Sequence, residues 1–467
     1  MANKYQLAVL GGGPGGYVAA VRAAQLGFKT VIIEKDNLGG ICLNWGCIPT
    51  KSLLKNAEIY DVMKNHSADF GIKVQGLGFD FSQIIKRSRE ISDRIVKNVG
   101  FLIKKNKIDV IKGFGKLTSS NKIDVFNPEG KCIDSITADN IIIATGARPK
   151  DIPAIPVDHK RIITSTEAMS LPEQPKELIV IGAGAIGVEF AYFYSVLGTK
   201  VTLIEMMDSI LPVEDREVSL TLEKSFKKRG IDILTSASVQ KAEVKGNNVK
   251  VSVLVNGSVK ELTADKVLCA VGVTGNVDGF GLENLGVELY KNHIKVNKPD
   301  YSTNVKGVFA IGDVIGPPWL AHVASAEGIH CVERIKGLTP PDINYDNIPG
   351  CTYCQPQVAS IGLTEQKAKD AGYELKIGKF PFMASGKAFA IGERDGFVKL
   401  IFDAKYGELL GAHIIGSEAT EMIAELAMAK SLEATADSII KTIHAHPTLS
   451  ESVMEAAGVA YNEAIHI

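Results

Sequence analysis

The chain lacks most features that mark secreted, membrane-spanning and nucleic-acid-binding proteins. Among 467 residues there are only seven cysteines and two tryptophans. So few cysteines exclude a disulfide-stapled scaffold, and the absence of an apolar run of about 18 residues argues against a transmembrane helix. There are 52 basic and 53 acidic residues, with no basic run, and the formal net charge is −1. This balance favours neither nucleic acid nor an anionic membrane as a partner.

What is present is typical of a large globular enzyme. The apolar fraction is 45 % and the charged fraction 22 %, both ordinary for a folded chain. The length exceeds what one hydrophobic core supports, so we expect about three domains. A strand-like run at residues 5–10 begins almost at once, with no signal or transit pattern before it. We therefore expect a cytoplasmic bacterial protein, with a processed mitochondrial matrix protein as the alternative.

Most of the cysteines predict no chemistry. Cys132, Cys269 and Cys331 are isolated, and we expect small buried residues. Cys351 and Cys354 form a C-x-x-C pair, which binds zinc or performs redox chemistry in some proteins. No second pair or histidine cluster completes a metal set, and no redox helix follows. A structural role for this pair is therefore favoured.

A dinucleotide-binding pattern occurs twice. Each copy has a strand, the pattern G-x-G-x-x-G, a helix and a second strand that ends in an acid, 18 positions after the last glycine. Such a repeat in matching context is strong evidence for two nucleotide-binding units. The first copy contains Gly11, Gly13, Gly16 and Glu34, and the second contains Gly182, Gly184, Gly187 and Glu205.

Both the glycines and the acids have physical roles in such units. The glycines let the backbone approach a pyrophosphate at the helix N-terminus, where free N–H groups accept negative charge. The terminal carboxylate accepts hydrogen bonds from ribose hydroxyls and repels a 2′-phosphate, so Glu205 favours NAD over NADP. The alternative for each acid is a solvated charge at a strand end.

Cys42 and Cys47 lie just after the first unit. Disulfide closure requires Cα atoms about 4.4–6.8 Å apart, so the chain must double back, and Gly39, Gly40 and Gly46 supply the freedom for this. From spacing alone, two inert buried thiols are as plausible as a redox pair.

The residues after Cys47 favour the redox interpretation. Pro49 suits a first helical turn, and Leu53, Ala57 and Tyr60 continue at helical spacing. Cys47 would then lie at a helix N-terminus, where the dipole favours a thiolate. A flavin exchanges electrons with thiols and passes a hydride to a nicotinamide. We therefore expect FAD on the first copy and NAD on the second.

Two further segments fit this layout. Residues 141–146 form a buried strand-like run ending in a turn, a plausible exit from the first domain. Residues 303–313 form another, which ends in Gly312 and Asp313. Asp313 could hold the polyol arm of FAD; the alternative is a turn-forming aspartate.

The last third changes character. Strand-like runs at 376–382, 397–402 and 409–415 accompany helical runs at 418–429 and 438–442, which predicts an α+β domain and an interface for dimerisation. Near its end stands the sequence His-Ala-His-Pro-Thr-Leu-Ser-Glu, residues 444–451. A histidine there suits a base for a thiol substrate. Thr448 and Glu451 also fit a helix capping box, which the residues alone favour.

Together these motifs resemble the pyridine nucleotide-disulfide oxidoreductases of the FAD/NAD type, over essentially the whole chain. The resemblance is carried by the following blocks: GGGPGG at 11–16, CLNWGCIPTK at 42–51, ATGARP at 144–149, GAGAIGVE at 182–189, AIGDV at 310–314, LAH at 320–322 and HAHPTLSE at 444–451.

The resemblance implies an α/β fold with two Rossmann-like FAD/NAD(P)-binding domains plus a C-terminal α+β dimerisation domain. The implied boundaries are 1–149 and 276–345 for a discontinuous FAD-binding domain, 150–275 for the NAD-binding domain and 346–467 for the dimerisation domain.

The resemblance also implies roles for individual residues. Cys42 would meet the substrate, Cys47 would form the charge-transfer thiolate beside the flavin, and Lys51 with Glu189 would lie near the reactive flavin nitrogen. His446, held by Glu451, would be the base in the partner subunit's site, which makes a homodimer necessary. Further cofactor-binding positions are Gly115, Thr145, Gly146, Gly272 and Ala321.

The function implied is that of a flavoprotein disulfide oxidoreductase that oxidises dihydrolipoamide, on protein-bound lipoyl groups, to lipoamide with NAD⁺ as acceptor. The partners implied are lipoyl domains and the acyltransferase core of 2-oxo acid dehydrogenase or glycine-cleavage complexes. The alternatives are a docking subunit of such a complex and a related NADH-linked disulfide reductase. One departure is visible: residues 272–276 read Gly-Val-Thr-Gly-Asn where relatives often have Gly-Arg-x-Pro-Asn.

Overall fold

The computed structural model describes residues 3–467, which form two compact units. The first unit comprises the chain up to Ser52, Gln83–Lys150 and Gly272–Ile343. The second comprises Leu53–Ser82, Asp151–Val271 and Asn344–Ile467. Within 3–467, no helix has the length and apolar character needed to cross a bilayer.

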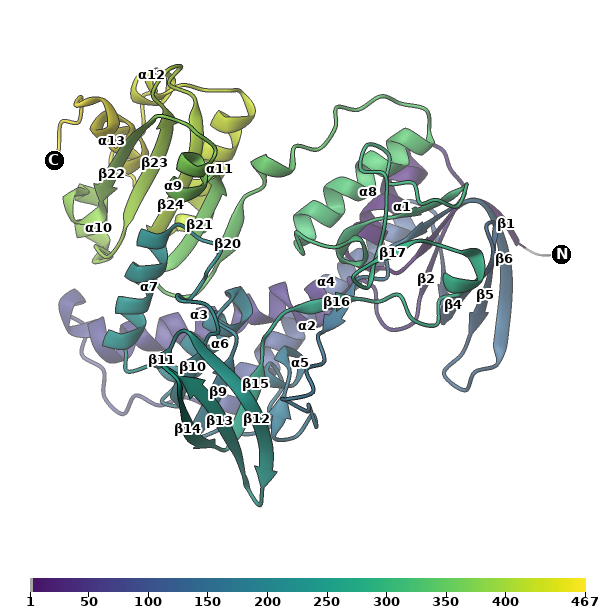
Figure 1. Cartoon of the computed structure of the whole chain (residues 1–467), viewed down its shortest axis with the longest axis horizontal. Coiled ribbons are helices and arrows are strands. Elements are labelled where there is room, and N and C mark those ends of the chain that lie inside the picture. Colours follow the sequence, from purple (N-terminus) through teal and green to yellow (C-terminus); the bar gives the residue numbers. More distant parts are fainter. Residues whose placement is uncertain (1–2) are drawn as a thin grey trace. The chain divides into compact units, whose positions relative to one another are not determined.

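The first unit is built on a seven-stranded sheet (Figure 1). Its strand order is β3-β2-β1-β6-β5-β4, and β19 pairs with the end of β6. Strands β1, β2, β3, β19 and the last part of β6 run parallel, whereas β4, β5 and the first part of β6 form an antiparallel meander. The bounds are β1 Asn3–Leu10, β2 Thr30–Glu34, β3 Asp109–Lys112, β4 Phe114–Ser119, β5 Lys122–Phe126, β6 Cys132–Ile143 and β19 Val308–Ala310.

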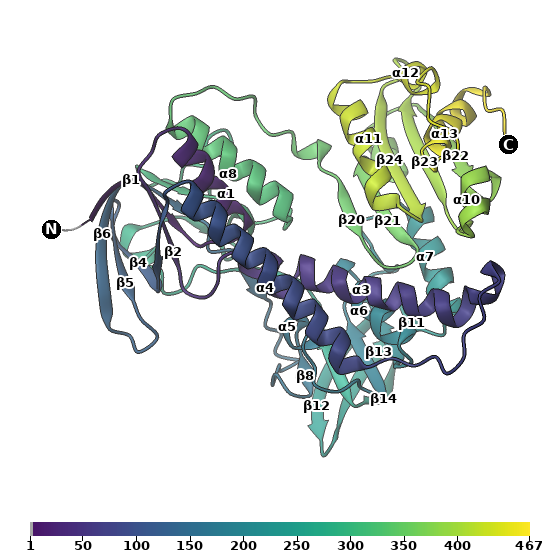
Figure 2. The same cartoon turned by 180° about the vertical axis from the view of Figure 1, so that it is seen from behind.

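Successive residues of the central strands bury opposite faces of this sheet, as the pleat requires. Leu7 and Val9 pack under helices, whereas Ala8 and Leu10 face the opposite core layer. The helical layer contains α1 Pro14–Gln25, α8 Ala321–Ile335 and part of α4 Phe81–Lys105, and Figure 2 shows α4 from its outer side. The strand expected over residues 303–313 is shorter than predicted, since only β19 forms a regular strand there.

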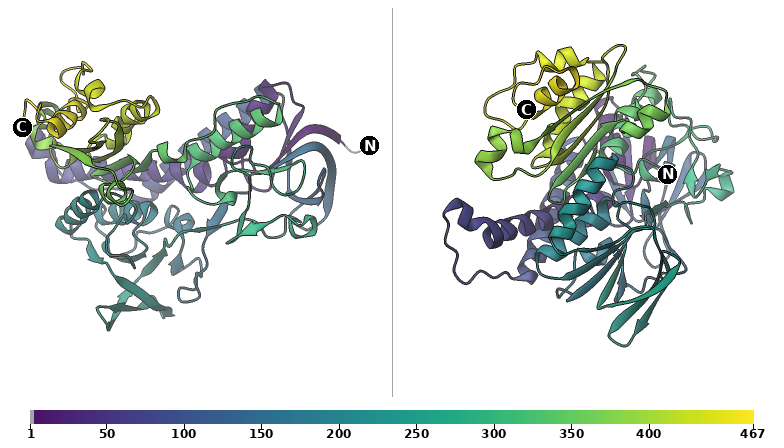
Figure 3. Two further views of the ribbon diagram at one scale, coloured as in Figure 1. Left: turned by 45° about the horizontal axis from the view of Figure 1, so that its top comes forward. Right: turned by 60° about the vertical axis from the view of Figure 1, so that its left-hand side comes forward.

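The second unit contains a second parallel sheet, ordered β11-β10-β9-β15-β8. An antiparallel meander, β12-β13-β14, forms a separate sheet that packs on it through a common apolar core (Figure 3). The bounds are β8 Ile162–Ile163, β9 Glu177–Ile181, α6 Ala185–Val196, β10 Lys200–Ile204, α7 Arg216–Lys228, β11 Asp232–Leu234, β12 Ala237–Lys245, β13 Asn248–Val255, β14 Ser258–Ala264 and β15 Lys266–Cys269.

The C-terminal part of this unit is an antiparallel sheet ordered β20-β21-β24-β23-β22, with helices packed on it. Strands β23 and β24 are buried along their whole length, as expected for a sheet covered on both faces. The bounds are β20 Gly350–Thr352, β21 Gln357–Gly362, α9 Glu365–Asp370, β22 Leu375–Pro381, α10 Gly386–Ile391, β23 Phe397–Asp403, β24 Leu409–Gly416, α11 Ala419–Ser431, α12 Ala436–Ile440 and α13 Glu451–Tyr461.

The predicted fold class is confirmed: two parallel α/β sheets precede a C-terminal α+β layer. One prediction about the cysteines is wrong. Cys269 and Cys331 are buried, but Cys132 is exposed, because it lies at the first residue of β6, next to the hairpin tip that joins β5 to β6.

Candidate active site

The two glycine turns have the same backbone geometry. Gly11 and Gly182 have φ of 106° and 98°, in the region that favours glycine. A Cβ on Gly16 would lie 1.9 Å from the Gly11 carbonyl oxygen, and one on Gly187 would lie 1.8 Å from that of Gly182. Only glycine therefore allows the helix to start this close to its strand. Both helices present free N–H groups at their first turns, as a pyrophosphate site requires.

The acids at the strand ends are held in the same way in both units. Glu34 accepts hydrogen bonds from the N–H of Gly12 at 2.7 Å and of Asp36 at 2.8 Å. Glu205 accepts from the N–H of Ala183 at 2.7 Å and of Met207 at 2.9 Å. Each carboxylate is thus oriented at the mouth of its glycine turn, where ribose hydroxyls bind in such folds.

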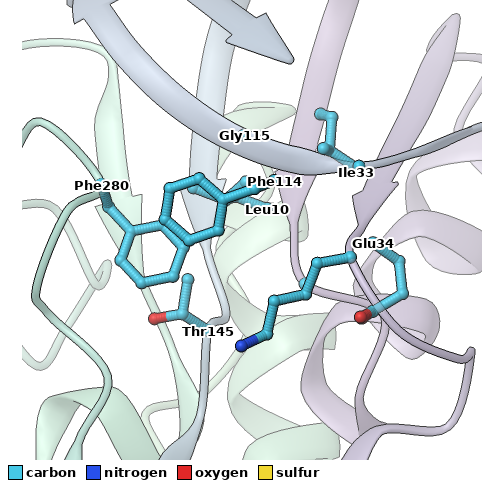
Figure 4. Close-up of a pocket in the computed structure, with 10 residues that line it drawn as sticks. Leu10, Ile33, Glu34, Phe114, Gly115, Thr145 and Phe280 are labelled. Carbon is cyan, nitrogen blue, oxygen red and sulfur yellow. The ribbon is translucent and has the colours of Figure 1, made fainter. Parts of the chain in front are cut away.

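A pocket opens beside the first turn. Figure 4 shows Glu34 on one side of it, with Phe114 and Phe280 on the other and Thr145 below their rings. Four predicted cofactor residues line this pocket: Gly11, Glu34, Gly115 and Thr145. Since a Cβ on Gly115 would lie 2.4 Å from Leu10 Cδ1, a larger residue would disturb the floor of the pocket. The aromatic wall and the carboxylate suit the base and the ribose of an adenosine.

Phe114 and Phe280 were not anticipated from the sequence. Their rings stack with centroids 4.7 Å apart and line the pocket. The two residues lie 166 positions apart in the sequence. The only local signal was the Gly-Phe-Gly run at 113–115, directly after β3.

Asp313 lies in a largely buried acidic environment. Burial raises its pKa to about 6, and the nearby carboxylate of Glu327 adds to the effect. Glu327 is itself buried and accepts a hydrogen bond from the N–H of Gly312 at 2.7 Å. A protonated or hydroxyl-paired Asp313 is what a polyol ligand would find here.

Residues 272–276, which depart from the family pattern, contribute to a two-stranded antiparallel ribbon within the first unit. Strand β16 Val273–Gly275 pairs antiparallel with β7 Ala147–Pro149. Arg148 donates to the Gly275 carbonyl at 3.0 Å and to Asp278 Oδ2 at 2.7 Å. Asn276 and Thr145 exchange hydrogen bonds of 2.7 and 2.9 Å. Gly146 and Gly272 adopt φ of 71° and 107° at the ends of this ribbon.

The segment that holds the two cysteines doubles back as expected. Cys42 lies in a short helix, α2 Gly40–Trp45, which the sequence did not predict, and Cys47 is the first residue of α3 Cys47–Asp61. A Cβ on Gly40 would lie 2.7 Å from Gly13 Cα, so the segment packs directly against the first glycine turn. A Cβ on Gly46 would lie 3.1 Å from the Ile41 carbonyl oxygen. The helix predicted after Cys47 is confirmed.

Cys42 and Cys47 are free thiols in hydrogen-bond contact. The hydrogen bond to Cys47 raises the pKa of Cys42, burial and the charge of Cys47 raise it further, and Lys51 opposes them. Cys42 therefore holds its proton more tightly than an ordinary thiol. The position of Cys47 at a helix N-terminus favours a thiolate there.

His446 is the exposed member of the histidine pair. Its side chain is 78 % exposed, and Nδ1 lies 2.9 Å from Glu451 Oε1. The other oxygen of Glu451 accepts from the Thr448 N–H at 2.8 Å. Burial raises the pKa of Glu451, but the bonds from Thr448 and His446 outweigh it and hold the pKa below its usual value. One carboxylate thus orients the ring and binds the backbone ahead of α13.

The predicted capping box is only half formed. Ser450, not Thr448, is the residue before α13, and Thr448 Oγ1 donates to the Ala445 carbonyl at 2.7 Å. The hydroxyl is turned away from the helix because this nearer carbonyl satisfies it. Only the return bond from the Thr448 N–H to Glu451 matches the prediction.

His444 has a different environment from His446, two residues away. Its side chain is only 5 % exposed, and Nε2 lies 2.6 Å from Glu425 Oε1 on α11. The hydrogen bond to Glu425 raises the pKa of His444 above the usual histidine value. A buried, paired ring of this kind suits a structural role.

The remaining predicted residues lie in separate units. Lys51 belongs to the first unit and Glu189 to the second, where Glu189 is buried and accepts from the Tyr353 N–H at 2.9 Å. Ala321 begins α8 in the first unit. Cys354 is buried and its thiol donates to the Pro356 carbonyl. Within residues 3–467, no three histidine, cysteine or acidic side chains gather as a metal site would require.

Comparison with known proteins adds two family matches. Residues 5–328 match the model of the pyridine nucleotide-disulphide oxidoreductases, and residues 348–457 match the dimerisation domain of the same family. The second match supports a homodimer.

Relatives of known sequence match over the full length. The chain is 49 % identical over 468 residues to the dihydrolipoyl dehydrogenase of Zymomonas mobilis and 48 % identical over 484 residues to that of Rhizobium etli, covering 100 % of both chains in each case. The Bacillus subtilis enzyme of the same name is 43 % identical, again with complete coverage.

Solved structures share the fold. LpdA of Mycobacterium tuberculosis superposes with a TM-score of 0.90 at 27 % identity, over 98 % of this chain and 99 % of that one. A copper complex of the flavoprotein disulfide reductase RclA of Escherichia coli superposes with a TM-score of 0.88 at 27 % identity and the same coverage. The chain therefore belongs to the pyridine nucleotide-disulphide oxidoreductase family, whose cofactors are FAD and NAD.

Proposed function

We propose that the chain is an NAD-dependent dihydrolipoyl dehydrogenase, which oxidises dihydrolipoyl groups to lipoyl groups. The observation that carries this proposal is the thiol pair packed against a dinucleotide turn. Gly40 approaches Gly13 so closely that a Cβ on Gly40 would lie 2.7 Å from Gly13 Cα, and Cys42 follows two residues later. Full-length relatives at 43–49 % identity with this activity in their names support the choice of substrate.

The residues of the two units fit the two cofactors. FAD would be held by the turn Gly11–Gly16, the pocket lined by Glu34 and Gly115, and Asp313. NAD would be held by the turn Gly182–Gly187 and by Glu205. FAD, when bound, supplies a two-electron carrier between the thiol pair and the nicotinamide.

The chemistry at the thiols follows from their separate environments. With the pair in its disulfide form, a dihydrolipoyl thiolate attacks Sγ of Cys42, the Cys42–Cys47 bond breaks, and Cys47 leaves as a thiolate. The second lipoyl thiolate then attacks the lipoyl sulfur of the mixed disulfide. The lipoyl ring closes, Cys42 is released and takes a proton, and the pair retains the two electrons. The raised pKa of Cys42 makes it the member that keeps a proton.

His446 is proposed as the base for these steps. It would take the proton of the attacking thiol at Nε2, because Nδ1 faces Glu451. Glu451 fixes the orientation of the ring. The exposed ring suits a group that serves the site of a second subunit in a homodimer.

The domain division and partners complete the proposal. We retain a discontinuous FAD-binding domain at 1–149 and 276–345, an NAD-binding domain at 150–275 and a dimerisation domain at 346–467. Lipoyl domains and the acyltransferase core of a 2-oxo acid dehydrogenase or glycine-cleavage complex are the proposed partners, in a bacterial cytoplasm. Co-purification with an acyltransferase core would demonstrate docking, and turnover of free dihydrolipoamide would demonstrate catalysis independent of a complex.

The decisive experiment is an anaerobic titration of the flavin-loaded enzyme with dihydrolipoamide. We expect a long-wavelength absorbance band from the Cys47 thiolate beside the flavin. Cys47→Ser should abolish the band, whereas Cys351→Ser should leave it unchanged. If the native enzyme develops no such band, the proposed thiol chemistry is wrong.

A further inference from the structure

The bend between Cys42 and Cys47 is held from outside by α4, a helix that the proposed mechanism does not use. Ser92 Oγ donates to the Leu43 carbonyl at 2.5 Å. The guanidinium of Arg89 donates from Nη2 to the Asn44 carbonyl. Its carbon atom also lies 4.3 Å from the centre of the Trp45 ring. Three consecutive residues between the thiols are therefore each contacted by α4.

Hydrogen bonds within the segment itself also restrict its backbone. Asn44 Nδ2 donates to the carbonyls of Leu38 and Gly40, at 3.0 and 2.8 Å. Thr50 Oγ1 donates to the Gly46 carbonyl at 2.7 Å. The contacts from α4 hold the C-terminal end of α2, where carbonyls have no partner within the helix.

If Arg89 served only to stabilise the fold, burying part of its guanidinium would be unfavourable. Its Nη1 is buried without a hydrogen-bond partner among the residues that the structure describes. Burial lowers its pKa, against the opposing charge of Asp93. A buried donor without a partner lowers the stability of the fold, and a methionine of similar length would occupy the space without that penalty. The guanidinium therefore suits a role in holding the bend.

We propose that Arg89, together with Ser92, is a positioning residue that holds the bend between Cys42 and Cys47 so that their sulfur atoms lie within reach of disulfide closure. This inference rests on the proposed redox role of the pair. A bend held in one geometry raises the effective concentration of one thiol at the other. Loosening the bend therefore weakens the disulfide relative to the dithiol.

The test measures the dithiol–disulfide equilibrium of the pair without using turnover. Flavin-loaded enzyme is equilibrated anaerobically with mixtures of oxidised and reduced dithiothreitol, quenched in acid and alkylated, and the thiols of residues 42 and 47 are quantified by mass spectrometry. On closure the two cysteines lose two electrons and two protons, which reduce one oxidised dithiothreitol. The measured quantity is the ratio of oxidised to reduced dithiothreitol at half closure.

We expect Arg89→Met to raise that ratio about tenfold, which corresponds to about 30 mV. Ser92→Ala should shift it in the same direction. Arg89→Lys should recover part of the native ratio, because lysine can donate to the Asn44 carbonyl but has no planar face for Trp45. Arg94→Met is the matched control: Arg94 is an exposed arginine on the same helix, and we expect no shift.

Thermal unfolding separates positioning from general stability. We expect Arg89→Met to unfold at the native temperature or above, because it removes a buried unpaired donor. A native ratio in both Arg89→Met and Ser92→Ala, or an equal shift in Arg94→Met, would refute the inference. If the native pair fails to close at any ratio, the proposed function fails instead.

Discussion

The two dinucleotide units have the same turn in different surroundings. In the first, a Cβ on Gly15 would lie 3.1 Å from the Ala324 carbonyl oxygen of α8, and one on Gly12 would lie 2.9 Å from Leu38 Cδ2. In the second, Ala183 is buried, but Ile186 is 44 % exposed and a Cβ on Gly184 would meet nothing within 4 Å. The first turn is the more enclosed of the two and the second is the more open. An enclosed turn suits a cofactor that stays bound, and an open one suits a cofactor that exchanges in every cycle.

The largest effects are expected when each turn is obstructed in the same way, which tests the assignment of one cofactor to each turn. Gly16→Ala and Gly187→Ala each place a methyl group less than 2 Å from a carbonyl oxygen. We expect Gly16→Ala to lose nearly all bound flavin. Gly187→Ala should keep its flavin and its reduction by dihydrolipoamide but lose reduction by NADH. Flavin-to-protein ratios and anaerobic spectra measure both. Loss of flavin in Gly187→Ala would reverse the assignment of cofactors.

The histidine pair tests whether oxidation of the thiol substrate depends on a residue that reduction by NADH does not need. His446→Gln should lower dihydrolipoamide turnover about 10²–10⁴-fold, the usual contribution of a general base. NADH-driven reduction of an artificial acceptor should remain nearly native, because that route needs no thiol substrate.

His444→Gln is the matched control for this variant. Its ring is buried against Glu425, so we expect lower thermal stability and less than a tenfold loss of turnover. Near-native dihydrolipoamide turnover in His446→Gln would show that the base lies elsewhere.

Substitution of the two strand-end acids should also distinguish the two cofactor sites, with smaller effects on cofactor binding. Glu205→Gln should raise KM for NAD⁺ about 10-fold or more, because hydrogen bonds to a charged group contribute roughly 1.5–3 kcal/mol. Glu34→Gln should leave that KM unchanged and weaken flavin retention instead. Steady-state kinetics and flavin release during dialysis measure the two effects. Equal changes in KM from both variants would contradict separate cofactor sites.

The smallest expected effect concerns Asp313. Its pKa is raised in the fold from 3.8 to about 6, so the folded state holds its proton more tightly than the unfolded state. The stability that this proton contributes is present at low pH and is lost as pH rises from about 4 to 6.

In flavin-free protein, Asp313→Asn should therefore increase stability at pH 7 by up to ~3 kcal/mol, with little change at pH 4. Denaturant unfolding at the two pH values measures the difference. A native-like dependence on pH in the variant would show that Asp313 does not carry this titration.

Sequence patterns predicted the regular elements around both glycine turns, because those signals are local. Strands β9 and β10 lie on either side of the second glycine turn and its helix, as the repeated pattern predicted, and the helix after Cys47 forms as expected. The short helix α2 was missed, since its six residues are too few to show a helical period. Cys132 was misjudged because its exposure depends on its place at a hairpin tip.

Contacts between distant segments could not be predicted in the same way. The stack of Phe114 on Phe280 and the contact of Arg89 with Trp45 join residues that are not neighbours in the sequence. The same is true of Lys399, a buried lysine on β23 that binds Asp215 at 3.0 Å and Glu365 at 2.6 Å. Of these residues only Trp45 belongs to a motif, the block at 42–51, and each pairing exists only because the fold brings its partners together.

The residue types and their spacing predict the chemistry of this protein. The cofactors and the kind of reaction are indicated by two thiols five positions apart, two glycine turns and two terminal acids. Each of these signals lies within one short segment of the sequence. The distinction between His444 and His446 required the folded chain. The residues are two positions apart and of the same type, but Glu425 from α11 covers one ring, whereas Glu451 orients the other toward solvent. The bend between the thiols likewise depends on α4, because its carbonyls find their donors some 45 residues away.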